Sequence, residues 1–329
     1  MIKLNDYLYS DDTIFKILQK YANDLENSAL DSRNQIDLAH CSFLKQIYEL
    51  LEHNEFLTSQ SQRLREFYKY MVKEYPYLAF TFKGRIKSII RAEEKFNRYI
   101  VDYIYEYYKK YECFPTIQEI KERLTCFRDL IAYRIVISVP KCHLGEGQNR
   151  DEEEEKLLYK IANKLPGFLE QYGFSVVKAN TEGRECSLLI DEELRDTYRD
   201  YVYRPTPSGY RALHLTLFDM EARCYIEVQL RTKEMDDSAE IGNANHLGYE
   251  KAQEQQRTHR EDIPEGQCLY FDEAYERVVS LESLDLSKLK VNMFAAVNNS
   301  LINDGCGLFR GRQILPFEHL SRYQTGALD

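Results

Sequence analysis

The chain has 329 residues, of which 43% are hydrophobic and 30% are charged, and it carries a formal net charge of −10 at pH 7. This length is enough for a substantial core and for two or three structural units. The acidic balance argues against a protein that coats duplex DNA through a broad basic surface, while a local basic pocket for a small phosphorylated ligand stays open.

Features of secreted and membrane proteins are missing from the sequence. No apolar run approaches the roughly 18 to 20 residues of a membrane span. The first residues, "MIKLNDYLYSDD", lack the basic segment and the apolar run of a signal peptide. The eight cysteines are scattered and form no C-x-x-C pair. We therefore expect a cytoplasmic protein with reduced thiols and no membrane partner.

The first part of the chain shows the periodicity of amphipathic helices. Between residues 11 and 80, apolar side chains recur three and four positions apart, as in "TIFKILQKYANDL" and "IDLAHCSFLKQIYELL". A further helix, rich in tyrosine in its second half, is expected from about Lys87 to Tyr111. We predict a helical N-terminal region over residues 1–80.

The period then changes to that of strands. Four segments are rich in β-branched and aromatic residues and are predicted as strands, at 130–139, 174–180, 212–218 and 224–232. Only five residues separate the last two, which predicts a hairpin. The polar segment "GEGQNRDEEEE" is expected to be a loop before a helix.

Strands mixed with helices indicate an α/β (α+β) core with helical additions at both ends. A helix is expected from Lys233 to about Gln256, and another in the segment that follows. We predict a core domain over residues 81–251 and a C-terminal extension of unknown role over 252–329.

Basic residues gather near the expected start of the helix at Lys87. Arg85 and Lys87 lie two positions apart, and Lys87, Arg91, Lys95 and Arg98 line one helical face. Such a run is usually a solvated surface. A helix N-terminus with converging cations can also hold a polyphosphate, because its amide N–H groups and the cations both favour negative charge.

Two carboxylates fall on segments that are expected to be neighbouring strands. Asp129 comes just before one strand, which contains Arg134. In "YIEVQLR", alternation puts Glu227, Gln229 and Arg231 on one face. An aspartate in a turn and a strand at the protein surface would give the same sequence pattern without any metal site. If the two carboxylates meet, they make a hard oxygen site for Mg²⁺, an arrangement suited to phosphoryl transfer.

Taken together, these segments resemble the synthetase domain of the RelA/SpoT family, which makes the alarmones (p)ppGpp of the stringent response. The motifs "GRIKS", "RDLIAYRIV", "DYVYRPTPSGYRALH", "IEVQLRT" and "MDDSAEIGNANHLGYEK" occur in that family's order, over roughly residues 82–251. The resemblance implies a nucleotidyltransferase-like mixed β-sheet flanked by helices. It also implies a transferase of the GTP pyrophosphokinase kind, which moves the β,γ-pyrophosphate of ATP to the 3′-hydroxyl of GDP or GTP.

The resemblance assigns residues to the donor and to the metal. Asp129 and Glu227 would hold Mg²⁺, and Glu227 would also activate the acceptor 3′-hydroxyl as a general base. The family often has serine at the position of Arg91. The residues on the ATP side are Arg85, Lys87, Arg91, Lys95 and Arg134.

The acceptor side departs from the family pattern. Tyr210 would stack on the acceptor base, an interaction that needs the ring and not the hydroxyl, with His214 and Gln229 lining that pocket. Thr206 and Ser208 stand where the family usually has lysine and asparagine. Arg199 replaces the usual lysine near the acceptor phosphates and keeps its charge.

Three functions stay open. No His-Asp dipeptide is present for the hydrolase activity of the long family members, so a small synthetase without a hydrolase domain fits best. The first alternative pyrophosphorylates the tRNA 3′ end or an adenine nucleotide, as toxic relatives do. The second is a catalytically inactive nucleotide-binding module. Small family members are often homo-oligomers, and the sequence leaves this open.

Overall fold

The computed structural model describes residues 1–10, 12–52, 56–87, 89–124, 128–179, 185–240, 257–285, 308–309 and 312–314. The chain forms two compact units, each built from separate stretches of sequence. The first unit contains 1–54, 87–127 and 252–313, and the second contains 55–86, 128–251 and 314–329. The domain boundaries expected from sequence, after residues 80 and 251, stay a prediction.

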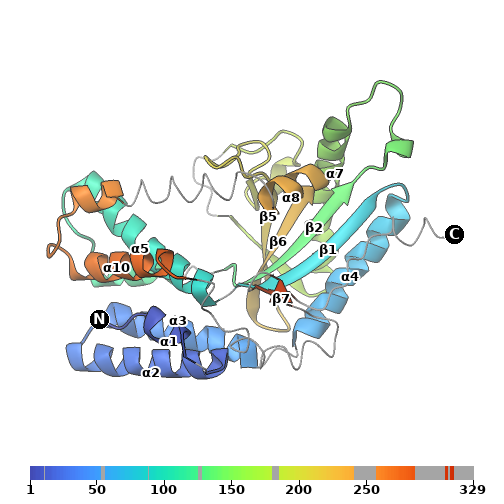
Figure 1. The fold of residues 1–329 in the computed structure, drawn as a ribbon. Coiled ribbons are helices and arrows are strands. Elements are labelled where there is room, and N and C mark those ends of the chain that lie inside the picture. Colours follow the sequence, from blue (N-terminus) through green and yellow to red (C-terminus); the bar gives the residue numbers. More distant parts are fainter. Residues whose placement is uncertain are drawn as a thin grey trace. The chain divides into compact units, whose positions relative to one another are not determined.

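The first unit is mainly helical (Figure 1). Helix α2 packs against α3, and α10 packs against α5. The expected helix near residues 87–111 is confirmed as α5. The helices are α1 (Asn5–Leu8), α2 (Ile14–Ser32), α3 (Gln35–Glu52), α5 (Ile89–Tyr111), α6 (Ile117–Leu124) and α10 (Leu269–Glu282), together with helical residues at 257–262. Two short antiparallel strands, β7 (Leu308–Phe309) and β8 (Arg312–Ile314), come late in the chain.

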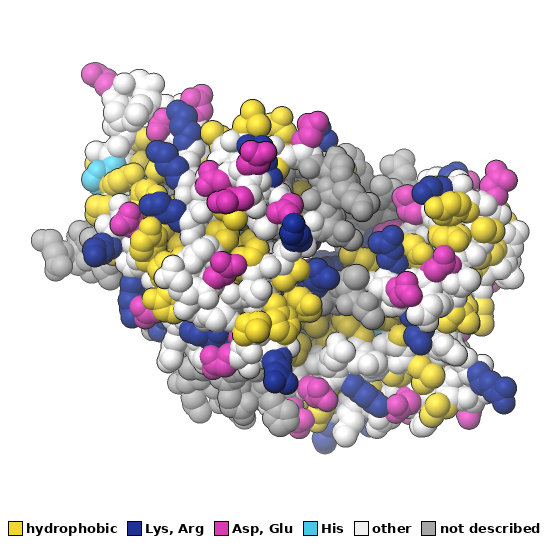
Figure 2. All heavy atoms as spheres, turned by 180° about the vertical axis from the view of Figure 1, so that it is seen from behind, with side chains coloured by type: hydrophobic (Ala, Val, Ile, Leu, Met, Phe, Trp, Pro, Cys, Tyr) yellow, Lys and Arg dark blue, Asp and Glu magenta, His cyan; other side chains and the backbone are white. Residues whose placement is uncertain are grey.

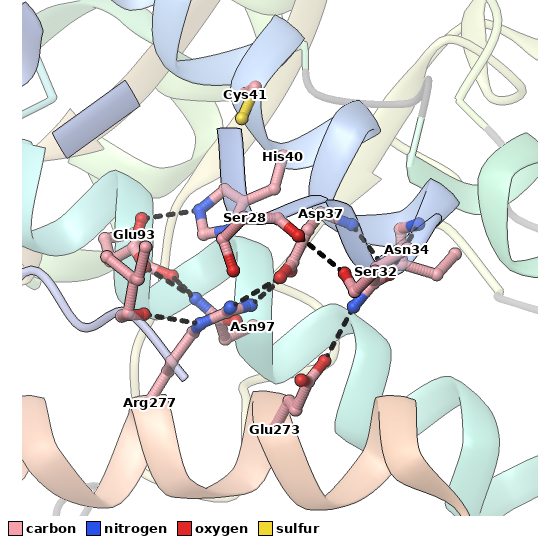
Figure 3. A network of polar contacts seen from close by, with 12 residues as sticks. Ser28, Ser32, Asn34, Asp37, His40, Cys41, Glu93, Asn97, Glu273 and Arg277 are labelled. Carbon is pink, nitrogen blue, oxygen red and sulfur yellow. Dashed lines mark hydrogen bonds and ion pairs between the residues drawn. The ribbon is translucent and has the colours of Figure 1, made fainter. Parts of the chain in front are cut away.

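A buried polar network links four of these helices (Figure 3). The Glu93 carboxylate of α5 accepts a hydrogen bond from the Tyr21 hydroxyl of α2 and lies 2.7 Å from Nε2 of His40 on α3. Arg277 of α10 donates two hydrogen bonds to Asp37 of α3, at 2.7 and 3.0 Å. A buried charge without a partner is costly, so these pairs specify how α10, late in the sequence, docks on helices from the start of the chain.

The second unit is built on a mixed sheet. Its strands follow the order β3-β5-β6-β2-β1, and β4 pairs with β5. Strands β2 and β6 are parallel, and the other pairs in this unit are antiparallel. The strands are β1 (Ala79–Ile86), β2 (Ile131–Ser138), β3 (Phe174–Val177), β4 (Tyr198–Asp200), β5 (Leu213–Asp219) and β6 (Cys224–Thr232). The predicted class, α/β with a mixed sheet flanked by helices, is confirmed, as is the predicted hairpin of β5 and β6.

The two faces of this sheet differ in polarity because side chains alternate along each strand. One face carries apolar residues such as Tyr133, Val228 and Leu215, all fully buried. Helix α7 (Arg150–Glu170) contacts β2, β3 and β6, and α4 (Phe56–Glu74) contacts β1. The Tyr133 hydroxyl donates to Oε1 of Gln60 on α4, which identifies the apolar face as the one that α4 covers. The opposite face is polar.

Some elements of the second unit differ from those expected from the sequence. Residues 79–86 are a strand, β1, where the sequence was expected to pass from one helix to the next. The signal was the alternation of Phe80, Phe82 and Gly84 with polar residues, which pairs well with β2. The sequence also did not predict two 3₁₀ helices, η1 (Lys141–His143) and η2 (Glu192–Leu194), or the short strand β4.

Part of the polar segment expected to be a loop, residues 150–155, instead forms the start of α7. The side chain of Asn149 caps the helix by accepting from the N–H of Asp151, at 3.0 Å. Asp151, Glu152 and Glu153 occupy the first turn. Carboxylates stabilise this end of a helix because the unpaired amide groups give it a partial positive charge.

The surface carries charges of both signs. On the face drawn in Figure 2, described Lys and Arg side chains are interspersed with Asp and Glu side chains. Six of the eight cysteines lie in described residues, and all six are free thiols. Among the helices that the structure describes, none combines the length and the apolar character needed to cross a membrane.

Candidate active site

The polar face of the sheet brings together residues from three strands. On β6, Glu227 and Gln229 share this face, and in the antiparallel register Gln229 lies opposite His214 of β5. His214 in turn lies opposite Arg199 of β4. The register therefore places a carboxylate, an amide, an imidazole and a guanidinium on one side of neighbouring strands, all of them residues that the sequence assigned to the site.

Glu227 is the centre of this group. Its side chain is only 6% exposed, and its Oε2 lies 2.6 Å from Nη2 of Arg199. The same oxygen lies 3.2 Å from Nδ1 of His214, while Oε1 accepts a hydrogen bond from Nε2 of Gln229 at 2.6 Å. Burial alone would raise the pKa of Glu227, but its interactions with His214, Arg199 and Gln229 outweigh burial and hold the pKa well below its usual range. Glu227 is therefore an ionised carboxylate although it is buried.

His214 connects Glu227 to the tyrosine loop. Its Nε2 lies 2.7 Å from the Tyr210 hydroxyl, and its ring meets the edge of Tyr201 with centroids 5.1 Å apart. Burial lowers the pKa of His214, and the positive charges of Arg199 and Arg231 lower it further, against the opposing charge of Glu227. The imidazole is therefore neutral at pH 7, lying between a phenol and a carboxylate.

The loop that carries Tyr210 is a tight turn held by its own hydroxyl groups. Gly209 adopts a φ of 78°, in the left-handed region that favours glycine. Oγ1 of Thr206 accepts from the N–H of Tyr210 at 3.2 Å and lies 2.9 Å from Oγ of Ser208. The structure thus gives Thr206 and Ser208 a role in shaping the turn, in addition to any contact with a ligand.

One side of the Tyr210 ring is already occupied. The Arg231 guanidinium lies 4.8 Å from the ring centroid, and its Nη2 donates to the Tyr210 hydroxyl at 2.5 Å. A cation over an aromatic face is a stabilising contact. A flat base that stacks on Tyr210 must therefore use the ring face that Arg231 leaves uncovered.

A second carboxylate holds two arginines on the same face. Oδ1 of Asp236, on helix α8 (Lys233–Glu240), accepts from Nη1 of Arg134 at 2.9 Å and from Nη1 of Arg231 at 3.2 Å. Two cations sharing one carboxylate leave a net positive charge, which suits phosphate groups. The sequence assigned Arg134 to the ATP side but gave no site role to Arg231 or Asp236. Alternation on β6 placed Arg231 on the right face, whereas only the packing of α8 reveals Asp236.

The remaining donor-side residues lie in different places. Arg85 on β1 lies opposite Ala132 on β2. Ala132 in turn lies opposite Glu227 on β6, so these three residues are at the same level on adjacent strands. Lys87, Arg91 and Lys95 belong to the first unit. There Arg91 is exposed and pairs with Glu94 at 2.6 Å, and the Lys95 ammonium lies 5.8 Å from the Tyr99 ring centroid. Their convergence on one ATP molecule stays a prediction.

The donor atoms available for Mg²⁺ are carboxylate oxygens. Asp129 comes two residues before Ile131, the first residue of β2, and Ile131 lies opposite Ile226 in the parallel register. Asp129 and Glu227 are thus near the same ends of adjacent strands. Within the described part of the chain, no cluster of three or more His, Cys, Asp or Glu side chains is placed to hold a metal. Mg²⁺ usually takes one or two carboxylates and completes its shell with water and substrate phosphates, and a metal shared by Asp129 and Glu227 stays a prediction.

Comparison with known proteins gives one family match whose residues include part of the candidate site. The family described as "Region found in RelA / SpoT proteins" matches residues 186–254. A probable guanosine-3′,5′-bis(diphosphate) 3′-pyrophosphohydrolase from Synechocystis is 28% identical over 139 residues, covering 40% of this chain and 18% of that protein. A GTP pyrophosphokinase from Photobacterium angustum is 32% identical over 114 residues, covering 32% of this chain and 15% of that protein.

Among solved structures, small alarmone synthetase 1 from Bacillus subtilis covers 72% of this chain and 92% of its own, with 18% identity and a TM-score of 0.31. This chain spans less than a fifth of the length of the two curated relatives above. The family match begins before Arg199 and includes Tyr210, His214 and Glu227. Residues 186–254 of this chain are therefore similar to the region found in RelA and SpoT proteins.

Proposed function

We propose that this protein is a pyrophosphokinase that transfers the β,γ-pyrophosphate of ATP to the 3′-hydroxyl of GTP or GDP. The observation that supports this most directly is the placement of Glu227 on the polar face of the sheet. Its buried carboxylate is oriented by Arg199, His214 and Gln229, and a positioned carboxylate can accept a proton from a hydroxyl group. Its position inside the segment that matches the RelA/SpoT region supports the assignment.

In the proposed reaction the acceptor 3′-oxygen bonds to the β-phosphorus of ATP. The bond between that phosphorus and the α,β-bridging oxygen breaks, and AMP leaves. Glu227 takes the proton of the 3′-hydroxyl. Asp129 and Glu227 would hold Mg²⁺, which when bound neutralises charge on the phosphates during transfer. The pair of guanidinium groups at Arg134 and Arg231 supplies positive charge on the same face.

The acceptor would be held by stacking and by charge. Its purine would lie on the uncovered face of Tyr210, since bases stack on aromatic rings irrespective of their hydrogen-bonding groups. Arg199, whose side chain is 31% exposed, is the partner of Glu227 that is accessible to a ligand. We infer that acceptor phosphates draw Arg199 away from Glu227, which frees the carboxylate for the hydroxyl and the metal.

The test is a transfer assay with ATP labelled at the γ-phosphate. Purified protein with Mg²⁺ is incubated with GDP, GTP, ATP and bulk tRNA in separate reactions, and the products are separated. We expect labelled guanosine tetra- or pentaphosphate together with AMP. Label on tRNA or on an adenine nucleotide would show that the acceptor is not a guanine nucleotide, while ATP would remain the pyrophosphate donor. Nucleotide binding without any transfer would identify an inactive binding module.

A further inference from the structure

We propose that Arg231 is a positioning residue for Tyr210: it fixes the ring on which the acceptor base would stack and does not itself contact the acceptor. This inference rests on the proposed function, because it deepens the account of how the acceptor nucleotide is held. The Arg231 guanidinium lies 4.8 Å from the centroid of the Tyr210 ring, and its Nη2 donates to the Tyr210 hydroxyl at 2.5 Å. One side chain therefore holds the ring both at its face and at its hydroxyl.

Burial separates the roles of these two residues. Only 3% of the Arg231 side chain is exposed, whereas Tyr210 is half-buried. A ligand that arrives from solvent can therefore reach the tyrosine ring but has little access to the guanidinium beside it. Arg231 differs in this respect from Arg199, whose partly exposed side chain is accessible to acceptor phosphates.

Arg231 is itself held by the sheet and by helix α8. Its Nη1 donates to Oδ1 of Asp236 on α8 at 3.2 Å, and its Nη2 donates to Oε1 of Gln229 on β6 at 3.0 Å. Asp236 also accepts from Arg134 of β2, and α8 packs against both β2 and β6. Because a guanidinium is planar and presents its donors in a rigid fork, these contacts fix its orientation. Regular elements of the fold therefore determine where Arg231 holds the ring.

Tyr210 depends on such a contact because it lies outside the strands. It belongs to the loop between β4, which ends at Asp200, and β5, which begins at Leu213. The hydrogen bond from its N–H to Thr206 organises the backbone of the turn but does not restrain the ring. A ring that is free to move must be ordered when a base binds, and this ordering costs affinity. A cation on one face of the ring reduces that cost in advance and leaves the other face for the base.

The experiment is a double-mutant cycle on acceptor binding, in which Arg231→Met and Tyr210→Ala are made singly and together. Isothermal titration calorimetry in the absence of ATP gives the dissociation constants of GDP, GTP and ADP, and the cycle uses the nucleotide that the wild type binds most tightly. Without Arg231, Asp236 keeps Arg134 at 2.9 Å and the Tyr210 hydroxyl keeps His214 at 2.7 Å. Arg231→Met therefore leaves Asp236 with a partner for its buried charge.

The matched control is Arg63→Met. Arg63, on α4, also lies over an aromatic ring in the second unit, with its Cζ 4.6 Å from the centroid of Phe174. Its Nη2 donates to the buried carboxylate of Asp219 at 2.6 Å. Helix α4 covers the apolar face of the sheet, so Arg63 shares the chemistry of Arg231 but not its place beside Tyr210.

We expect Tyr210→Ala to weaken nucleotide binding roughly 5- to 150-fold, as for the loss of a stacked base. Arg231→Met should weaken binding by a smaller factor, about three- to tenfold, which is the range for ordering one side chain. In the double variant the dissociation constant should equal that of Tyr210→Ala alone, because Arg231 acts only through the ring. Arg63→Met should lower the stability of the protein and bind nucleotide as the wild type does.

Wild-type affinity in Arg231→Met would overturn the inference. A further loss of affinity in the double variant would also overturn it, since Arg231 would then act on the acceptor by a route other than the ring. The same holds if Tyr210→Ala binds all three nucleotides as the wild type does. Should circular dichroism show that Arg231→Met is unfolded, Arg231→Lys, which keeps a cation but not the planar fork, replaces it with the same expectations.

Failure of this inference is distinguishable from failure of the proposed function. The cycle measures binding in the absence of the pyrophosphate donor, so its result does not depend on transfer. If the cycle shows the expected pattern but the wild type transfers no pyrophosphate to any acceptor, the proposed function fails and the positioning role of Arg231 stands. If transfer occurs and the cycle shows independent effects, the proposed function stands and the role of Arg231 fails.

Discussion

Arg199 and Glu227 form an ion pair of 2.6 Å between strands that are not neighbours, since β5 lies between β4 and β6. The pair therefore reaches across β5, the strand that contains His214 and Thr216. Nη2 of Arg199 also donates to Oγ1 of Thr216 at 3.3 Å. Arg199 is the more exposed partner, with 31% of its side chain exposed against 6% for Glu227.

The first prediction concerns this pair. Arg199→Ala should raise the acceptor KM about 10- to 150-fold, the range that corresponds to the loss of about 1.5–3 kcal/mol in a charged hydrogen bond. Arg199→Lys should recover part of this, because it restores the charge but not the planar fork. Steady-state kinetics with each nucleotide varied in turn gives the two KM values. A rise in the ATP KM with an unchanged acceptor KM would show that Arg199 serves the donor instead.

The second prediction concerns the buried network of the first unit (Figure 3). Arg277→Met removes one partner of a buried ion pair and leaves Asp37 as an uncompensated charge. We expect the free energy of unfolding to fall by about 3–5 kcal/mol, measured by urea denaturation and circular dichroism. The matched control is Lys45→Met, because Lys45 pairs with Glu26 on the surface of the same unit, where such pairs contribute about 0–1 kcal/mol. Equal effects of the two substitutions would contradict this account.

The third prediction is a pH dependence of stability set by Asp219. Burial raises the pKa of this carboxyl, but hydrogen bonds from Arg63, Gln60 and the N–H of Ala222 outweigh burial and lower it. A folded-state pKa below the unfolded value of about 3.9 means that the stabilisation is complete above that pH. It is lost as the pH falls through the lower, folded-state pKa.

Asp219→Asn should therefore destabilise the protein at pH 7, by about 1.5–3 kcal/mol for lost charged hydrogen bonds. The difference between variant and wild type should shrink on acidification below the unfolded pKa of about 3.9. Urea midpoints measured from pH 7 down to pH 3 provide the comparison. Glu221→Gln, at an exposed residue that also faces Arg63 at 3.4 Å, is the control and should show little change. A constant difference across this pH range would contradict the assignment.

Local pattern was sufficient to predict the strand that carries the site. The alternation in "CYIEVQLRT" predicted a strand over residues 224–232, and β6 has the same bounds. It also placed Glu227, Gln229 and Arg231 on one face. The start of α7 was missed because its capping by Asn149 and the helix dipole favour helix in a segment whose composition is typical of loops.

The roles of Arg231 and Asp236 could not be predicted because they depend on tertiary packing. Asp236 reaches the polar face only because α8 lies against β2 and β6. The hydroxyl of Tyr210 likewise has two partners that are 4 and 21 residues away in sequence. These hydrogen bonds could not be predicted either, because stacking of a base needs only the ring and no local pattern indicates partners for the hydroxyl.

Whether Glu227 is the base of a pyrophosphate transfer is decided by comparing the wild type with Glu227→Gln in the labelled-ATP assay. Glutamine keeps the shape but cannot accept the proton or contribute charge to Mg²⁺. We predict that the wild type labels GDP or GTP and releases AMP, and that Glu227→Gln abolishes this transfer while circular dichroism shows an intact fold. A folded Glu227→Gln variant with turnover near that of the wild type would exclude Glu227 as the base.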